Sequence, residues 1–128
     1  MIVMYQQQLA AHPNDPNLLR DLARAQMGAR QYDAARKSAE QAVTFAPSDP
    51  EYLLSLGAVL LTLGRTEAAI AQHERAIKLK PDYADAHFNL AVIYATSVPP
   101  NLALSRKCYA RALELGSERD PAMERLLK

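Results

Sequence analysis

The side chains that could support catalysis or bind a metal are few and far apart in the sequence. The histidines are His12, His73 and His87, and the single cysteine is Cys108. A metal site needs several such ligands at short spacings, and a phosphate site needs a glycine-rich loop. Neither pattern occurs, and no nucleophile motif is present. We therefore predict no enzyme activity, no bound metal and no cofactor, and structural roles for the three histidines.

The pattern gives the single cysteine, Cys108, no structural or metal-binding role. One cysteine excludes an internal disulfide and a multi-cysteine zinc site. We expect it on the outer side of its helix, as an incidental thiol.

The composition indicates one domain without a nucleic-acid or membrane partner. Of 128 residues, 49% are hydrophobic and 6% aromatic, and the net charge is +1 without a basic block. Because nucleic-acid binding leaves a basic patch, we predict none. The longest uncharged apolar stretch, residues 52–64, is too short to span a bilayer, so we expect no membrane insertion. The N-terminus lacks the pattern of a secretion signal, which favours the cytoplasm without fixing the compartment.

The segments that must position these side chains repeat along the chain. Sliding the sequence by thirty-four residues superposes Pro13 on Pro47 and Pro47 on Pro81. Within residues 50–83, leucines at helical spacing lead to Gly64, and a second helical run ends before Pro81. Each unit is therefore a helix, a short turn and an antiparallel helix. A period of this length is typical of stacked helical hairpins.

Residues 50–83 resemble a tetratricopeptide repeat. The family has large residues, small residues and a proline at fixed positions, which are here Leu53, Leu56, Gly57, Leu60, Ala69, Ala76 and Pro81. His73 stands where the family usually has an aromatic residue. The resemblance implies an all-α fold, a right-handed superhelical solenoid of antiparallel helix pairs. It also implies a non-enzymatic module for protein–protein interaction.

In this register the chain divides into three full repeats with a partial repeat at each end. The predicted units are residues 1–15 (a second helix alone), 16–49, 50–83, 84–119 and 120–128 (a C-terminal capping helix). The third full repeat has two extra residues in its turn, where we expect Pro100 in the first turn of the second helix. Gln26 and Ala39 occupy positions of large residues, so we expect the first full repeat to pack least well.

The resemblance also implies a concave groove lined by the first helix of each repeat. Spacings of four and three residues keep side chains on one helix face. The predicted lining is Arg20, Arg24 and Met27, then Leu54, Ala58 and Leu61, then Phe88, Val92 and Ala95, with Asn89 at the border. Such a groove is basic at one end and apolar elsewhere. We predict that it binds a peptide segment with apolar side chains and an acidic group near the arginines.

Two alternatives stay open. In the first, a neighbouring helix covers the apolar positions and the arginines pair with Asp21 or Glu51, which leaves an architectural or oligomerising segment without a peptide ligand. In the second, molecules stack weakly head to tail, with apolar residues 2–4 of one copy against residues 123–127 of the next. We favour a monomer over stacking.

The family includes a clamp for acidic C-terminal tails of heat-shock chaperones. The positions that form this clamp in the family are held here by Arg20, Arg24, Ser55, Asp85 and Asn89. Asp85 stands where the clamp has a cation, so we predict a different specificity. The apolar groove of secretion chaperones is closer, by analogy.

Overall fold

The computed structural model describes residues 1–128 and contains eight α-helices and no strands. The helices are α1 (Ile2–Ala11), α2 (Pro16–Gly28), α3 (Tyr32–Phe45), α4 (Pro50–Thr62), α5 (Thr66–Leu79), α6 (Ala84–Thr96), α7 (Leu102–Glu114) and α8 (Pro121–Leu126).

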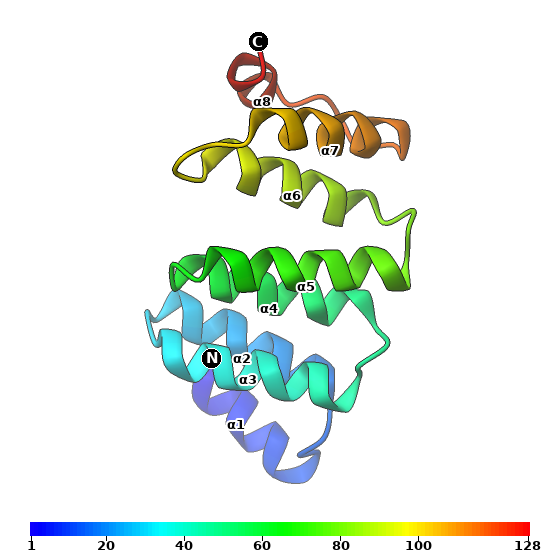
Figure 1. Cartoon of the computed structure of the whole chain (residues 1–128). Helices are drawn as coiled ribbons and strands as arrows, with labels where there is room; N and C mark the ends of the chain where they lie inside the picture. The colour runs from blue at the N-terminus through cyan, green and yellow to red at the C-terminus, as the bar shows by residue number, and fades with distance from the viewer.

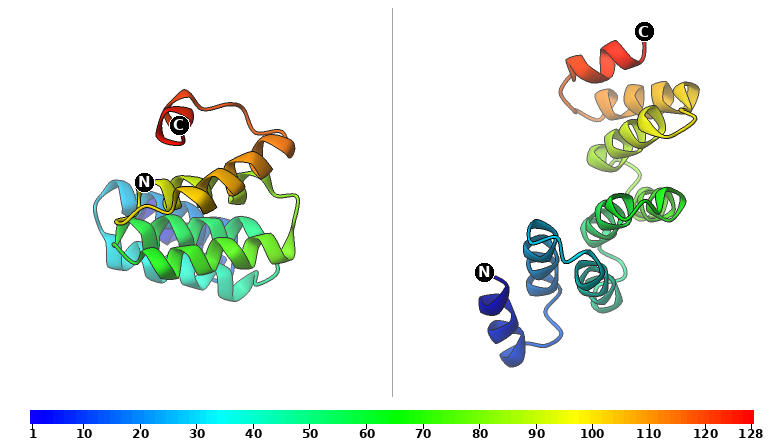
Figure 2. Two further views of the ribbon diagram at one scale, coloured as in Figure 1. Left: turned by 45° about the horizontal axis from the view of Figure 1, so that its top comes forward. Right: turned by 90° about the vertical axis from the view of Figure 1, so that its left-hand side faces the viewer.

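The helices form an open stack of hairpins. Helix α2 pairs with α3, α4 with α5 and α6 with α7, while α3 packs on α4 and α5 on α6 to join successive hairpins. Helices α1 and α8 lie at opposite ends of the stack (Figures 1 and 2). This arrangement confirms the all-α solenoid that the sequence predicts.

Three helices begin with the same two-residue signal, aspartate followed by proline. Asp15 Oδ1 accepts a hydrogen bond from the Asn17 amide at 2.9 Å, and Asp49 and Asp120 cap α4 and α8 in the same way. The proline that follows loses nothing, because the first amide of a helix has no intrahelical partner. These signals fix where α2, α4 and α8 begin.

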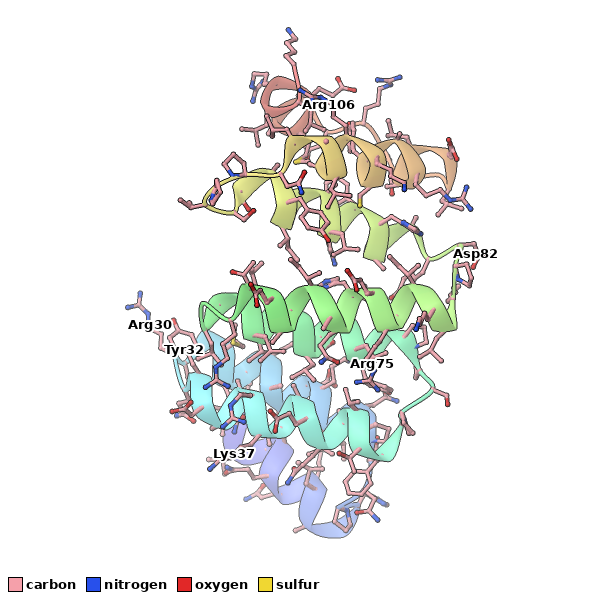
Figure 3. The ribbon with its side chains drawn as sticks, viewed as in Figure 1. Arg30, Tyr32, Lys37, Arg75, Asp82 and Arg106 are labelled. Atoms are coloured by element: carbon pink, nitrogen blue, oxygen red, sulfur yellow. The ribbon has the colours of Figure 1, made fainter.

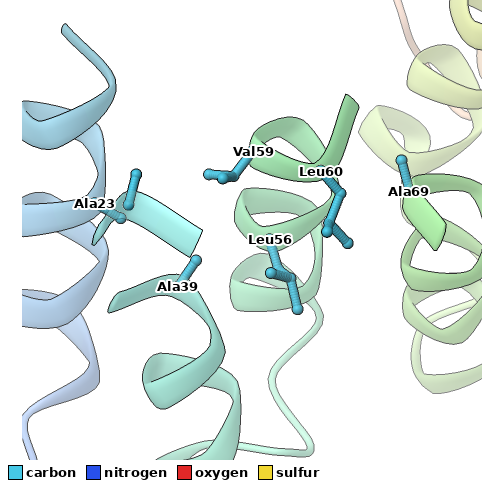
Figure 4. Close-up of a cluster of buried hydrophobic side chains, with 7 residues drawn as sticks. Ala23, Ala39, Leu56, Val59, Leu60 and Ala69 are labelled. Carbon is cyan, nitrogen blue, oxygen red and sulfur yellow. The ribbon is translucent and has the colours of Figure 1, made fainter. Parts of the chain in front are cut away.

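The core is a series of small clusters along the stack. In one of them Ala23 of α2 and Ala39 of α3 meet Leu56, Val59 and Leu60 of α4 (Figure 4). Burying one leucine side chain contributes roughly 1.5–3 kcal/mol, so the leucines of α4 supply much of the adhesion between neighbouring hairpins. Alanines such as Ala35 and Ala69 have no exposed surface, and their small side chains let the helices approach closely.

Gln26 is buried, although its position suits an apolar residue. It is 5% exposed, and its Oε1 accepts a hydrogen bond from Ser38 Oγ of α3 at 2.7 Å. The bond satisfies the amide oxygen inside the hairpin. A polar pair therefore joins α2 to α3 where the sequence alone suggests poor packing.

His73 is also buried, at 2% exposure. Its Nδ1 lies 2.8 Å from the carbonyl oxygen of Ala69, so this nitrogen carries the proton and donates. The ring lies against Gly57, the one residue of α4 without a side chain. Burial lowers the pKa of His73, and the hydrogen bond to Ala69 opposes that shift.

The turn of the last hairpin differs from the sequence prediction. Helix α7 begins at Leu102, and Asn101 caps it by accepting from the Leu104 amide at 3.1 Å. Pro100 therefore precedes the cap and is not in the first turn of α7, because the asparagine competes successfully for the capping position. Ser105 Oγ donates to the Ala91 carbonyl at 2.6 Å and ties α7 to α6.

The contact between Gly57 and His73 predicts a sharp steric penalty. A Cβ added at Gly57 lies 2.5 Å from His73 Cε1, so Gly57→Ala should lower the free energy of unfolding by about 1–3 kcal/mol, measured by urea denaturation. Gly28 is the matched control, since nothing lies within 4 Å of an added Cβ there. Gly28→Ala should leave stability unchanged or raise it slightly. Equal midpoints for both variants would contradict this packing.

The buried imidazole predicts a loss of stability in mild acid. The unfolded chain protonates His73 near its ordinary pKa of 6.5, whereas the folded protein resists protonation. The contribution of neutral His73 to the free energy of unfolding is therefore fully present above pH 6.5. It is lost as the pH falls from 6.5 toward the lower pKa of the folded state. His73→Phe should remove this component from the melting temperature measured against pH. The same substitution at exposed His12 should retain it, and identical profiles for the two variants would contradict the assignment.

Candidate functional site

The predicted groove residues surround a hollow between α2, α4 and the start of α6. It has a volume of about 550 Å³. Its lining consists of Arg20, Ala23, Arg24, Met27, Glu51, Leu54, Ser55, Ala58, Val59, Tyr83, Asp85 and Asn89. Six of these belong to the predicted lining: Arg20, Arg24, Met27, Leu54, Ala58 and Asn89. Three different hairpins supply them, so the repeat register brings distant residues together.

The other predicted residues do not line this hollow. Leu61 lies beyond it near the end of α4 and is 38% exposed. Phe88 and Val92 pack against the cluster formed by Ala91, Ala95, Tyr109 and Met123. The rings of Phe88 and Tyr109 are 6.3 Å apart between centroids and tilted by 53°. Ala95, the fourth, is itself buried in that cluster at 8% exposure. The hollow is therefore shorter than the sequence pattern suggests, and a role for these four residues in ligand contact stays a prediction.

Helix α8 accounts for the covered end. Met123 is buried against α6 and α7, and Leu127 packs on the same cluster. The backbone amide of Asp120 donates to the Tyr109 hydroxyl at 2.9 Å, and Arg106 Nε donates to the Leu127 carbonyl at 3.0 Å. The C-terminal segment thus packs Met123 and Leu127 on its own chain, while Leu126 is 48% exposed. Cys108, predicted to face outward, is half-buried beside this cluster, and burial raises the pKa of its thiol.

Arg20 connects two walls of the hollow. Its guanidinium donates to the Glu51 carboxylate of α4 and lies 3.6 Å from Asp21 Oδ1. It also lies over the Tyr52 ring, 5.6 Å from the centroid. Only 16% of its side chain is exposed. Arg20 is therefore part of the wall, and its charge is already compensated.

Arg24 is the freer of the two arginines. Its side chain is 67% exposed, and the carboxylate nearest to it is Asp21, at 4.0 Å. A guanidinium in that position retains donors for a ligand carboxylate. The predicted basic end of the groove thus reduces to Arg24, because Arg20 is paired.

Sequence reasoning named Glu51 as a partner for the arginines and Asp85 as a departure from the chaperone-tail clamp, but placed neither in the groove lining. Glu51 and Asp85 occupy the first turns of α4 and α6. Each lies three residues before a predicted groove residue, Leu54 and Phe88, so the same helical spacing was the available signal. Two acidic and two basic side chains therefore line the hollow, and its charges balance.

Two further hollows occur elsewhere in the molecule. One of about 780 Å³ lies between α1 and α2 and includes Met1, Ile2 and Val3. Another, of about 600 Å³, lies among α5, α6 and α7. Neither gathers residues from the first helices of all three hairpins. No group of three His, Cys, Asp or Glu side chains is placed to hold a metal ion, and no helix has the length and apolarity needed to cross a membrane.

The stacked helix pairs and the hollow between their first helices define a helical repeat protein of the solenoid class. Family models described as "Tetratricopeptide repeat" and "TPR repeat" match residues 2–58 and 59–97. The chain belongs to the tetratricopeptide repeat family. No curated protein sequence matches it.

Solved structures share this fold. MamA is 25% identical, with a TM-score of 0.76 over 90% of this chain and 66% of MamA, just under two thirds of its length. The Sgt2 TPR domain from Aspergillus fumigatus is 26% identical, with a TM-score of 0.75 over 88% of this chain and 74% of that domain. The first TPR of Spaghetti (RPAP3), bound to the HSP90 peptide SRMEEVD, is 19% identical, with a TM-score of 0.76 over 87% of this chain and 86% of that domain.

Proposed function

We propose that this tetratricopeptide repeat protein is a non-enzymatic interaction module whose hollow holds a peptide segment of another protein. The observation that carries the proposal is the convergence of Arg24, Leu54 and Asn89 from three successive hairpins on one hollow. A volume of about 550 Å³ accepts a few side chains of a peptide and excludes a folded domain.

The apolar wall gives the segment its first source of affinity. Met27 of α2 and Leu54 and Ala58 of α4 line one continuous hollow. Apolar side chains of the peptide that enter it leave water, which contributes roughly 25 cal/mol for each Å² buried. Because the walls belong to helices fixed by the core, little ordering cost arises on binding.

Arg24 gives the segment its second anchor. Its exposed guanidinium offers paired donors to an acidic side chain or a C-terminal carboxylate. Arg20 supports the wall and is not the anchor, because only 16% of its side chain is exposed and its charge is compensated by Glu51 and Asp21.

The fold itself is compatible with a peptide ligand, since the RPAP3 domain carries one. The specificity proposed here is different. Asp85 lies in the lining at a position where the clamp for acidic chaperone tails needs a cation. A peptide with acidic residues along its length would meet repulsion at this point.

Arg24→Ala tests the anchor. The probe is a fluorescein-labelled peptide with a leucine-alanine centre and glutamates at one end, and binding is measured by anisotropy. We expect affinity to fall about three- to tenfold, which corresponds to one exposed charge-assisted contact. Arg75→Ala on α5 removes an exposed arginine outside the hollow and should change nothing (Figure 3).

Leu54→Ser tests the apolar wall with the same probe and should weaken binding further.

Equal affinity of wild type and Arg24→Ala would remove the arginine from the site. If wild type binds neither the probe nor the peptide of reversed sequence, the peptide-groove proposal is wrong and the architectural alternative is favoured.

We also propose a monomer. Head-to-tail stacking needs an apolar C-terminal face, but Met123 and Leu127 pack on their own chain. Only Leu126, 48% exposed, remains there to meet the exposed Met1, Val3 and Met4 of another copy. Light scattering should therefore give the mass of one chain, 14.1 kDa, across a concentration series. A mass that rises with concentration would contradict this and restore the stacking hypothesis.

A further inference from the structure

The exposed polar groups of the hollow are separated into two ends of opposite character. After the pairing of Arg20 with Glu51, the exposed cation is Arg24 on α2, 4.0 Å from Asp21 and 67% exposed. On α6, Asp85 is exposed and takes part in no ion pair, and the Asn89 side chain makes no hydrogen bond within the protein. The lining therefore offers a cation on one side and a free carboxylate with an amide on the other.

The α6 end has a negative local environment. Tyr83, which also lines the hollow, has its pKa raised by burial and then by the charges of Asp85, Glu51 and Asp49. The cation beside it is Lys80, with Nζ 5.0 Å from the Tyr83 centroid, and Lys80 does not line the hollow. Of these three carboxylates, Glu51 and Asp85 line the hollow and border the ligand space.

Asp85 and Asn89 are placed to act together. They are four residues apart on α6, so both side chains lie on one helix face. Asp85 lies in the first turn of α6, near the positive end of the helix dipole. A carboxylate with an amide oxygen beside it matches the three donors of a lysine or the fork of an arginine.

We propose that the hollow selects a bipolar segment: an acidic group at Arg24, apolar side chains on Leu54, and a lysine or arginine at Asp85 and Asn89. This inference rests on the proposed peptide groove and defines the class of its ligand. Like charges supply the specificity as much as opposite ones, because a wholly acidic segment is repelled at Asp85 and a wholly basic one at Arg24.

The experiment compares labelled peptides that share one leucine-alanine centre. Their ends are acidic and basic in both orders, both acidic, or both basic. Wild type should bind one of the bipolar orders at least about fivefold more tightly than either uniform peptide, a modest effect for two exposed contacts. The preference should weaken as salt increases.

Charge reversal at Asp85 gives the decisive comparison. Asp85→Lys should invert the ranking, so that the doubly acidic peptide becomes the tightest ligand. Asp33→Lys is the matched control, because Asp33 is also an exposed first-turn acid but lies on α3 outside the hollow. It carries the same cost against a helix dipole and should retain the wild-type ranking. Thermal melts establish that both variants are folded.

The outcomes separate the two proposals. If wild type binds the doubly acidic peptide as tightly as the bipolar ones and Asp85→Lys leaves the order unchanged, bipolar selection is wrong and the peptide groove stands. If wild type binds none of the peptides, both are wrong.

Discussion

Close approach between helices, made possible by small residues at fixed positions, is the constraint on which the structure depends. A single hairpin cannot cover its own apolar face, so it must adhere to its neighbours. Ala35, Ala69 and Ser105 occupy equivalent places on α3, α5 and α7, and none has exposed surface. A larger side chain at these places would separate the paired helices and with them the leucines that join one hairpin to the next.

Within that constraint, departures from the family pattern are compensated by the facing helix. The Gly57 surface accepts the His73 ring, and the Ser38 hydroxyl satisfies buried Gln26. Periodicity placed Gly57, His73 and Gln26 on the correct helices, because spacing alone decides which helix face is buried. It did not pair them across the hairpin, because a pairing depends on side-chain size and hydrogen bonding between helices. The sequence therefore predicted the solenoid, whereas the side-chain contacts between its paired helices were found only in the structure.

The candidate site shows the same division. The repeat register placed Arg24, Met27, Leu54, Ala58 and Asn89 around one hollow. It left open whether α8 covers the residues at the far end and whether Glu51 pairs with Arg20, and the structure shows both contacts. Both are contacts between elements far apart in sequence, and both depend on the geometry of stacking. Charge balance in the hollow is therefore a property of the assembled repeats, which no single repeat displays.

The ion pair between Arg20 and Glu51 links the fold to the proposed function. It joins the first helices of two hairpins at the rim of the hollow, and Tyr52 supports the guanidinium from below the pair. Surface ion pairs contribute little to stability, typically less than about 1 kcal/mol. The larger effect of the Arg20–Glu51 pair is to neutralise Arg20, which leaves Arg24 as the exposed cation in a lining that also contains Asp85. A groove with two free arginines would favour acidic segments generally, whereas the proposed selection by charge order depends on one exposed arginine and one free carboxylate in the same lining.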